Sequence, residues 1–483
     1  MNASSTSAVA PHLSVDDIRA IEQDLSEPTF RDVPVGPAIS SLLGIELYIR
    51  HGDWRFRNTL KNRLRFIYHH LRPFRQPESD VSCCRGRVLV TWYEANFRCT
   101  DLVLPVAKQL GPERCVLLYR SREIVDLVPP DAASLHLSHA MSYDVRAWRR
   151  DYGLYWSRIR PLLARIVTQF GFPPGVYHRL ADAILTCTQS IAGYQEFLHR
   201  ARPAAILTEY DRNASWAPLI LSAKAFGIPT YTMVHGVMGD EAIGFYPLLA
   251  DKIFCWGRLD QAKLIAAGLD PNRTVIAGCP RLTRTLLAET GAARIKLGLN
   301  PQKPVVMLAT DPFPLKERLQ FAEGFCSAVR GENDLSAVVR LHPVEDLKVY
   351  ADLALRFPTV KFTTNDAWTV DEALSAADII VTHCSGLGSD ALIKGRLVVV
   401  LDMIDVPLGH GKELVVTAGC PRAKSPEELR DILRRLLNSE TERQRYRLAA
   451  DRFSSKFCAF FGDDAACRTA SHILSCLPKG LDS

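Results

Sequence analysis

The sequence predicts an α/β protein with two Rossmann-like, doubly wound domains facing a cleft, preceded by a helical, basic N-terminal extension. Short apolar runs of strand length alternate with helical segments of about ten residues through most of the chain. Polar loops follow many of these apolar runs directly. The length of 483 residues exceeds that of one ordinary domain. These observations together favour two parallel-sheet domains over a single large one.

The clearest α/β pattern covers residues 338–401. A strand at 337–341 leads into His342-Pro343, and strands at 378–382 and 397–401 follow in close order. Thr369 and Glu372 have the spacing of a capping box, which predicts that a helix begins there. Apolar runs this short suit strands buried on both faces of a parallel sheet. Ligands bind beyond the carboxyl ends of such strands, where His342 and the Ser385-Gly386 turn are expected.

The Ser385-Gly386 turn leads into a helix that extends through Lys394. Such a turn presents free N–H groups and the positive end of a helix dipole, which suit a phosphate. The stretch therefore resembles half of a site for a nucleoside monophosphate or diphosphate.

Residues 1–85 are interpreted as the N-terminal extension. It begins with a Ser/Ala-rich tail and contains a basic segment, residues 50–75, with eight Lys or Arg and the single acid Asp53. Apolar residues recur there at helical spacing, from Phe56 to Leu71. One interpretation is a helix on an anionic membrane surface, close to a lipid-linked substrate. The other is a helix packed on its own domain with solvated arginines.

The first domain is predicted to cover residues 86–290. Acidic residues follow two of its strands, Glu94 after residues 87–92 and Glu209 after residues 205–208. The strand at 229–234 runs into His235-Gly236, and the strand at 274–278 is followed by Pro280-Arg281. Residues 144–199 are predicted to be mostly helical core. The carboxyl ends of these strands are expected to face the cleft.

The second domain is predicted to cover residues 291–483, with its first strand at 304–310. Ser425, Pro426 and Glu428 predict the start of a helix at 427–437. The final segment, residues 460–476, is expected to pack back on the first half.

Composition limits the functional classes. The net charge of +6 is modest for this length and says little by itself, because the basic residues cluster at 50–75. No nucleic-acid partner is expected. Thirteen scattered cysteines show no zinc-type spacing, and the N-terminus has no secretory signal, which favours reduced thiols in a cytoplasm. No apolar run approaches the length of about 18 residues that a spanning helix needs. Any membrane contact is expected to be peripheral, through residues 50–75.

Several motifs carry a resemblance to a known group. Residues 228–236, ending in His235-Gly236, then residues 250–257, then Ala277-Gly-Cys-Pro-Arg281 resemble the N-domain signature of surface-polysaccharide glycosyltransferases of GT-B architecture. Arg340-Leu-His-Pro343 and His383-Cys-Ser-Gly-Leu-Gly-Ser-Asp390 resemble the C-domain signatures. The group includes capsule Kdo transferases, bacterial polysialyltransferases and CDP-glycerol glycerophosphotransferases. The resemblance covers residues 204–470 well and residues 86–110 weakly.

The resemblance implies a cytoplasmic, membrane-associated glycosyltransferase at the inner face of the membrane. It would move a sugar from a nucleotide-activated donor to a surface polysaccharide or lipid-linked acceptor. The family places the His of His-Pro and the Ser-rich turn at the donor phosphate, and the N-domain His-Gly at the acceptor. No Asp-x-Asp motif of the metal-dependent architecture occurs, so neither metal nor cofactor is expected. The Ser-Ser pair common in the family is Ser385-Gly386 here.

Each candidate has a structural alternative. His342 either donates to a phosphate beside the turn set by Pro343 or caps a strand end. Arg340 either clamps a phosphate or forms an ion pair, and Asp390 either binds a ribose hydroxyl or favours its helix N-terminus. The proposed base is His235, or else Glu94, Glu209 or Asp211, whereas His383 is expected to support its loop. The expected catalytic residues are His235, Glu94 and Glu209, and the expected donor-binding residues are Arg340, His342, Pro343, Ser385, Gly386, Asp390 and Arg281.

Other functions fit the same pattern. A CDP-polyol phosphotransferase would use the same two sites. A UDP-GlcNAc 2-epimerase shares the fold and has a Ser-Gly-Gly turn similar to Cys384-Ser-Gly386, although the acidic residues after that turn are not matched. A non-catalytic partner of a polysaccharide assembly complex would keep the fold and lack the chemistry.

Overall fold

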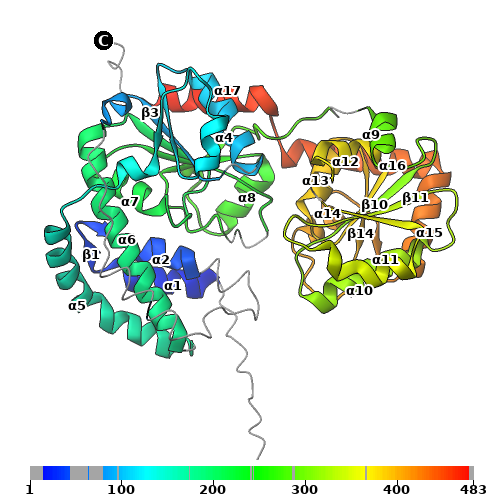
Figure 1. The fold of residues 1–483 in the computed structure, drawn as a ribbon, viewed down its shortest axis with the longest axis horizontal. Helices are drawn as coiled ribbons and strands as arrows, with labels where there is room; N and C mark the ends of the chain where they lie inside the picture. Colours follow the sequence, from blue (N-terminus) through cyan, green and yellow to red (C-terminus); the bar gives the residue numbers. More distant parts are fainter. Residues whose placement is uncertain are drawn as a thin grey trace, which may run out of the picture. The chain divides into compact units, whose positions relative to one another are not determined.

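The chain folds into two compact units, each with its own parallel sheet (Figure 1). The computed structural model describes residues 15–43, 64, 80–94, 97–172, 174–239, 242, 244–285, 289–364 and 367–477. The first unit contains residues 1–256, Asp260–Pro280 and Asp463–Ser483, and the second contains Gly257–Leu259 and Arg281–Gly462. The predicted fold class of two Rossmann-like α/β domains is confirmed.

The second unit has a six-stranded sheet in the order β12-β11-β10-β13-β14-β15, and all its pairings are parallel. This is the doubly wound order 3-2-1-4-5-6, in which the chain reverses direction between the first and fourth strands. The strands are β10 (Val305–Ala309), β11 (Ser336–Arg340), β12 (Val360–Thr363), β13 (Ile379–Thr382), β14 (Leu397–Leu401) and β15 (Arg422–Ala423). The switch point therefore lies between the carboxyl ends of β10 and β13.

The helices of the second unit cover the two faces of its sheet. They are α9 (Thr290–Lys296), α10 (Leu315–Val329), α11 (Ala351–Arg356), α12 (Val370–Ala376), α13 (Gly386–Ile393), α14 (His410–Val416), α15 (Pro426–Asn438) and α16 (Glu440–Phe457). The predicted capping box of Thr369 and Glu372 is present at α12. Ser425 caps α15, whose buried residues Leu429, Ile432, Leu433 and Leu436 follow the helical period.

The first unit has a seven-stranded sheet in the order β5-β4-β3-β6-β7-β8-β9, again with parallel pairings. Its switch point lies between β3 and β6. The strands are β3 (Val88–Trp92), β4 (Cys115–Tyr119), β5 (Ser134–His136), β6 (Ala205–Thr208), β7 (Thr230–Met233), β8 (Lys252–Cys255) and β9 (Thr274–Ile276). Helices α4 (Phe97–Leu110), α7 (Ala217–Ala225) and α8 (Arg258–Ala266) connect them.

A helical module with its own hydrophobic core belongs to the first unit. Helices α5 (Val145–Gln169) and α6 (Pro174–Ala201) pack with α1 (Val15–Ser26), α2 (Gly36–Leu43) and the hairpin of β1 (Thr29–Phe30) and β2 (Val33–Pro34). Aromatic rings fill this core, with Trp148 and Tyr152 stacked at 5.3 Å. Residues 15–43 are thus part of the first unit, which corrects their assignment to a separate extension.

The unit boundaries also differ from the expected ones at the C-terminal side. The chain enters the second unit at Arg281 rather than 291, and it leaves after Gly462. The last helix, α17 (Gly462–Ser475), returns to the first unit, where His472 packs edge-on against Tyr231 and Phe254 (Figure 1, red). The apolar surface of β7 and β8 supplies this contact, so residues 463–483 belong to the first unit.

The predicted basic segment at residues 50–75 lies outside the described residues, apart from the exposed Leu64. None of the helices in the described part of the chain is long and apolar enough to cross a membrane.

Candidate functional site

The two signature loops of the second unit meet at its switch point. Thr310 and Asp311 directly follow β10, the strand that pairs with both β11 and β13. His342 follows β11 on one side, and Ser385 follows β13 on the other. Because the carboxyl ends of parallel strands meet at one edge, this is where a doubly wound sheet binds its ligand.

The His342-Pro343 loop is anchored to the end of β10. The backbone N–H of His342 donates to Thr310 Oγ1 at 2.8 Å and to Glu345 Oε2 at 2.9 Å. The N–H of Val344 donates to His342 Nδ1 at 3.4 Å, which requires an unprotonated Nδ1 and places the proton of a neutral imidazole on Nε2. His342 is half-buried and Pro343 is exposed, so the ring sits at the surface of the loop.

Glu345 is the centre of this anchor. Its side chain is fully buried, and Oε2 accepts from both the His342 N–H and the Thr310 hydroxyl. Oε1 lies 3.0 Å from Arg318 Nε in an ion pair and accepts from the Tyr350 hydroxyl at 3.2 Å. Burial and the charge of Glu345 raise the pKa of Tyr350, which therefore stays a donor. Sequence reasoning missed Glu345, although an acid three residues after His342 was a visible signal.

The Ser385-Gly386 turn forms the N-terminus of α13. Ser385 Oγ accepts from the N–H of Leu387 at 3.4 Å, and the N–H of Ser385 donates to Thr382 Oγ1 at 3.0 Å. Gly386 is the first residue of the helix. Ser385 therefore acts as a helix cap, a role compatible with an anion bound at the same terminus.

Asp311 connects β10 to the Ser385 turn, and sequence reasoning missed it as well. Its Oδ2 accepts from the N–H of Cys384 at 3.3 Å, and the residue is only 6% exposed. Burial, with a smaller contribution from the charge of Glu345, raises the pKa of Asp311 to about 7. An acid directly after the predicted strand at 304–310 was the signal available in the sequence. Thr310 and Asp311 together link the two signature loops through one strand end.

Two expected donor residues bind each other. Arg281 Nη1 donates to Asp390 Oδ2 at 3.1 Å, and both side chains are nearly buried. The second oxygen, Asp390 Oδ1, is buried and accepts no hydrogen bond from the described residues. The pair fixes the entry of the chain into the second unit against α13 and leaves one carboxylate oxygen for a hydroxyl donor.

Arg340 and His383 lie beneath the site. Arg340 is 6% exposed, and its Nη2 donates to the Trp368 carbonyl at 3.4 Å. Burial lowers the pKa of Arg340, and its position favours the structural alternative over a phosphate clamp. His383 is fully buried, with Nδ1 3.1 Å from the Leu401 carbonyl and Nε2 3.1 Å from the Val406 carbonyl. It supports its loop, as predicted.

The switch point of the first unit is filled by Glu209. This carboxylate is 1% exposed and accepts from the Thr91 hydroxyl at 2.6 Å, the Tyr93 N–H at 2.7 Å and Trp216 Nε1 at 3.1 Å. It thereby joins the end of β3 to the end of β6. Burial raises the pKa of Glu209 to about 7. Because its oxygens are occupied by protein donors, the geometry favours a structural role for Glu209 over that of a base.

His235 lies at the end of β7, between two aromatic rings. The Tyr210 ring centroid is 4.2 Å from the imidazole, and that of Phe245 is 4.6 Å away. His235 is half-buried, and a side chain at the adjacent Gly236 would meet nothing within 4 Å. The two rings orient the imidazole, and open space lies at the next residue, Gly236. Glu94 is exposed after β3, two strands away in the sheet, and its carbonyl accepts from Trp92 Nε1 at 3.0 Å.

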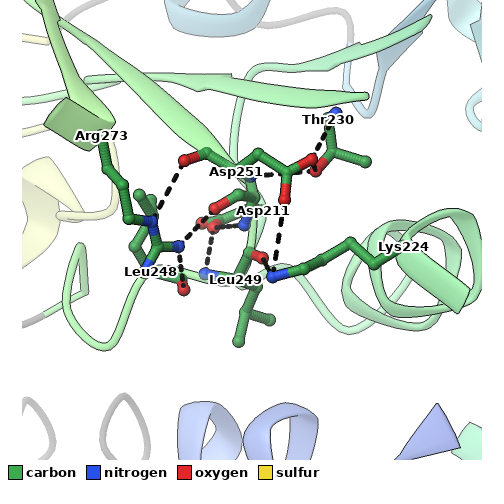
Figure 2. A network of polar contacts seen from close by, with 8 residues as sticks. Asp211, Lys224, Thr230, Leu248, Leu249, Asp251 and Arg273 are labelled. Atoms are coloured by element: carbon green, nitrogen blue, oxygen red, sulfur yellow. Dashed lines mark hydrogen bonds and ion pairs between the residues drawn. The ribbon is translucent and has the colours of Figure 1, made fainter. Parts of the chain in front are cut away.

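Asp211 belongs to a structural network instead (Figure 2). Its Oδ2 accepts from the N–H groups of Leu249 at 2.7 Å and Ala250 at 2.9 Å. Arg273 donates to the Leu248 carbonyl at 3.0 Å from the other side, and Asp251 accepts from the Thr230 hydroxyl at 2.7 Å. The network attaches the loop before β8 to the sheet, which leaves Asp211 inaccessible as a base.

No family model matches the chain, and no curated protein matches it. Among solved structures, UDP-GlcNAc 2-epimerase from Neisseria meningitidis bound to UDP-GlcNAc aligns with a TM-score of 0.50 at 13% identity, covering 80% of this chain and 99% of the epimerase. A putative UDP-N-acetylglucosamine 2-epimerase from Listeria monocytogenes aligns at 0.52 and 15% identity, covering 81% and 96%. Anabaena HepE in complex with UDP aligns at 0.50 and 12% identity, covering 81% and 100%.

The fold is GT-B. At these identities the likeness establishes the fold alone. Both GT-B domains are represented, because the alignments cover nearly the full length of each solved structure. Within the described residues, no group of three or more His, Cys, Asp and Glu side chains is arranged to hold a metal ion.

Proposed function

We propose that this GT-B protein is a glycosyltransferase that binds a nucleotide-activated sugar on its second unit and transfers the sugar to a glycan acceptor. One observation carries the proposal: Thr310 and Asp311 bring the His-Pro loop and the Ser-Gly turn together at a single switch point. This gives an Nε2–H donor on His342 and a helix N-terminus on α13 for the leaving phosphate.

The acceptor is proposed to be a surface polysaccharide or a lipid-linked oligosaccharide, as the sequence motifs imply. The reaction is proposed to be metal-independent and cytoplasmic. Residues 50–75 would bring the protein to the inner face of a membrane. The sequence supports this location through the cationic, amphipathic pattern of that segment.

Nucleotide binding tests the donor site. In a thermal-shift screen against CMP, CDP, UDP, GDP and ADP, one nucleotide is expected to stabilise the protein by about 2.7 kcal/mol at about 100 times its Kd. His342→Ala is expected to reduce that shift, because the variant lacks the Nε2–H donor. The matched control is His199→Ala, an exposed histidine of α6 in the other unit. Equal shifts in wild type and His342→Ala would remove His342 from the site.

His235 is the proposed general base. Its ring is half-buried beside Tyr210 and Phe245, whereas Glu209 and Asp211 are buried and accept hydrogen bonds from protein donors. His235→Ala is expected to lower kcat by roughly 10²–10⁴-fold while the nucleotide shift is retained. Consumption of the nucleotide sugar in the presence of acceptor glycan measures kcat. A parallel Glu209→Gln variant with near-normal kcat would support the assignment, and normal turnover by His235→Ala would refute it.

Epimerisation is the second candidate, because the buried carboxylates Asp311 and Asp390 both lie at the donor side of the second unit. A 2-epimerase changes the configuration of UDP-GlcNAc without an acceptor, whereas a transferase requires one. Proton NMR of UDP-GlcNAc incubated with the protein alone distinguishes the two. A new nucleotide-sugar species formed without acceptor would replace the transferase proposal.

A further inference from the structure

A cavity lies in the first unit, away from the strand ends that carry His235. It has a volume of about 600 Å³ and is walled by the β1–β2 turn and by the start of α5. The last turns of α6 and α7 complete it. Those two helices lead directly into the amino ends of β6 and β7. The cavity therefore opens at the opposite edge of the sheet from the carboxyl ends, where catalysis is proposed.

The turn that walls the cavity is strained. Arg31 and Asp32 connect β1 to β2 in a two-residue hairpin, with φ of +47° and +64°. Such turns normally use Asn-Gly, because side chains with a Cβ are disfavoured in this region. Two contacts hold Arg31 in this conformation. Arg31 Nε donates to Asp151 Oδ2 at 2.9 Å, and Gln195 Nε2 donates to the backbone carbonyl of Arg31 at 2.9 Å. Backbone strain of this kind is commonly retained at functional sites.

The wall of the cavity carries more acidic than basic side chains. Asp32, Asp144 and Glu196 contribute carboxylates; Asp144 Oδ1 caps α5, Glu196 Oε1 lies 3.9 Å from Arg200 Nε, and Arg31 is paired with Asp151. Phe226 is 43% exposed at the rim, and Tyr143 forms part of the wall. Carboxylates, the Gln195 amide and an exposed ring suit a ligand with hydroxyl or amino donors and an apolar face. The excess of carboxylates disfavours a phosphate or a nucleotide.

We propose that this cavity binds a sugar unit without negative charge, neutral or amino-bearing, as an exosite for the glycan acceptor. The identification of the ligand as the acceptor rests on the proposed transferase function. Phe226 would pack against one sugar face, and Asp32 and Glu196 would accept from its hydroxyl or amino groups. Binding here holds a long glycan on the first unit independently of the site at His235.

Saturation-transfer NMR tests the exosite with three trisaccharides of equal length: maltotriose, a glucosamine trimer and trigalacturonate. Maltotriose or the glucosamine trimer is expected to bind the wild type, and trigalacturonate is not. Phe226→Ala is expected to weaken binding at least about fivefold, and Asp32→Gly about tenfold. Glycine tolerates the positive φ, so Asp32→Gly removes the carboxylate and is expected to keep or raise the melting temperature. Weaker trisaccharide binding by Asp32→Gly at an unchanged or higher melting temperature would therefore reflect the lost carboxylate and not unfolding.

His235→Ala is the positional control and is expected to leave trisaccharide binding unchanged. Loss of binding in His235→Ala, equal binding of trigalacturonate, or binding of none of the three at millimolar concentration would each overturn the exosite. The nucleotide thermal shift separates the two proposals. Trisaccharide binding without any nucleotide shift would remove the transferase assignment and leave the sugar site standing. A nucleotide shift without trisaccharide binding would remove only the exosite.

Discussion

Replacing Glu345 with alanine is expected to lower the free energy of unfolding of the second unit by about 3–5 kcal/mol and to abolish the nucleotide-induced thermal shift. The carboxylate is fully buried, accepts three hydrogen bonds and pairs with Arg318, so its removal deprives Arg318 of its counter-ion. It also releases the N–H of His342 and the hydroxyl of Thr310, which set the His-Pro loop. Urea unfolding and the nucleotide screen measure the two effects.

Glu345→Gln distinguishes the hydrogen bonds of Glu345 to the His-Pro loop from its negative charge. An amide oxygen in the place of Oε2 still accepts from His342 and Thr310, while the amide N–H₂ faces Tyr350 and Arg318. We expect a loss of roughly 1–2 kcal/mol from the weakened Arg318 contact, with the nucleotide shift retained. Rescue by glutamine would identify Glu345 as a positioning residue for the donor loop.

The control for Glu345 is Glu323→Ala. Glu323 pairs with Arg356 on the surface of the same unit, with side chains 43% and 47% exposed. Exposed pairs contribute about 0–1 kcal/mol, so this variant is expected to be nearly neutral for stability and for nucleotide binding. If Glu345→Ala behaves like Glu323→Ala, the loop is not held by the buried carboxylate.

Glu209 is expected to make the stability of the first unit depend on pH. Burial raises its pKa from 4.5 to about 7, so between these values the folded chain binds a proton that the unfolded chain has released. This stabilising contribution of Glu209 is fully present below the pKa of its carboxyl group in the unfolded chain. It is lost as the pH rises through the pKa of the same group in the folded chain. The free energy of unfolding is therefore expected to fall by up to about 3 kcal/mol from pH 4.5 to above 7.

Glutamine reproduces the protonated form of Glu209. Its oxygen can accept from Tyr93 and Trp216 while its N–H₂ donates to the Thr91 hydroxyl. Glu209→Gln is therefore expected to remove the part of the pH dependence of the unfolding free energy that is due to Glu209. Glu209→Ala is expected to destabilise the first unit at every pH, because it leaves buried donors without acceptors. The raised pKa of Asp311 also makes the unfolding free energy fall as the pH rises. The test is therefore the difference between the pH profiles of wild type and Glu209→Gln. Identical pH profiles of the two would show that Glu209 titrates normally.

The sequence predicted most of the strands along the chain, the helix caps and the two signature loops. Each of these features depends on residues that are neighbours in the sequence. Thr369 and Glu372 form the predicted capping box, and the predicted strand at 397–401 has the same bounds as β14. The short edge strands β5, β12 and β15 were missed, since polar residues interrupt each of them and none forms an apolar run. Placing His342 and Ser385 at one sheet edge needed only the parallel-sheet rule.

Tertiary structure decided which of the polar residues act together. Arg281 and Asp390 are 109 positions apart, and only the fold shows that they form an ion pair. Glu209 was predicted as a catalytic candidate, yet its surroundings occupy its oxygens, whereas Glu345 and Asp311 gained importance only from their contacts. The elements, and the edge of the sheet where the site lies, could be predicted from the sequence, because periodicity and capping are local. The partners of each buried charge were decided by the fold, because burial and pairing depend on which strands become neighbours.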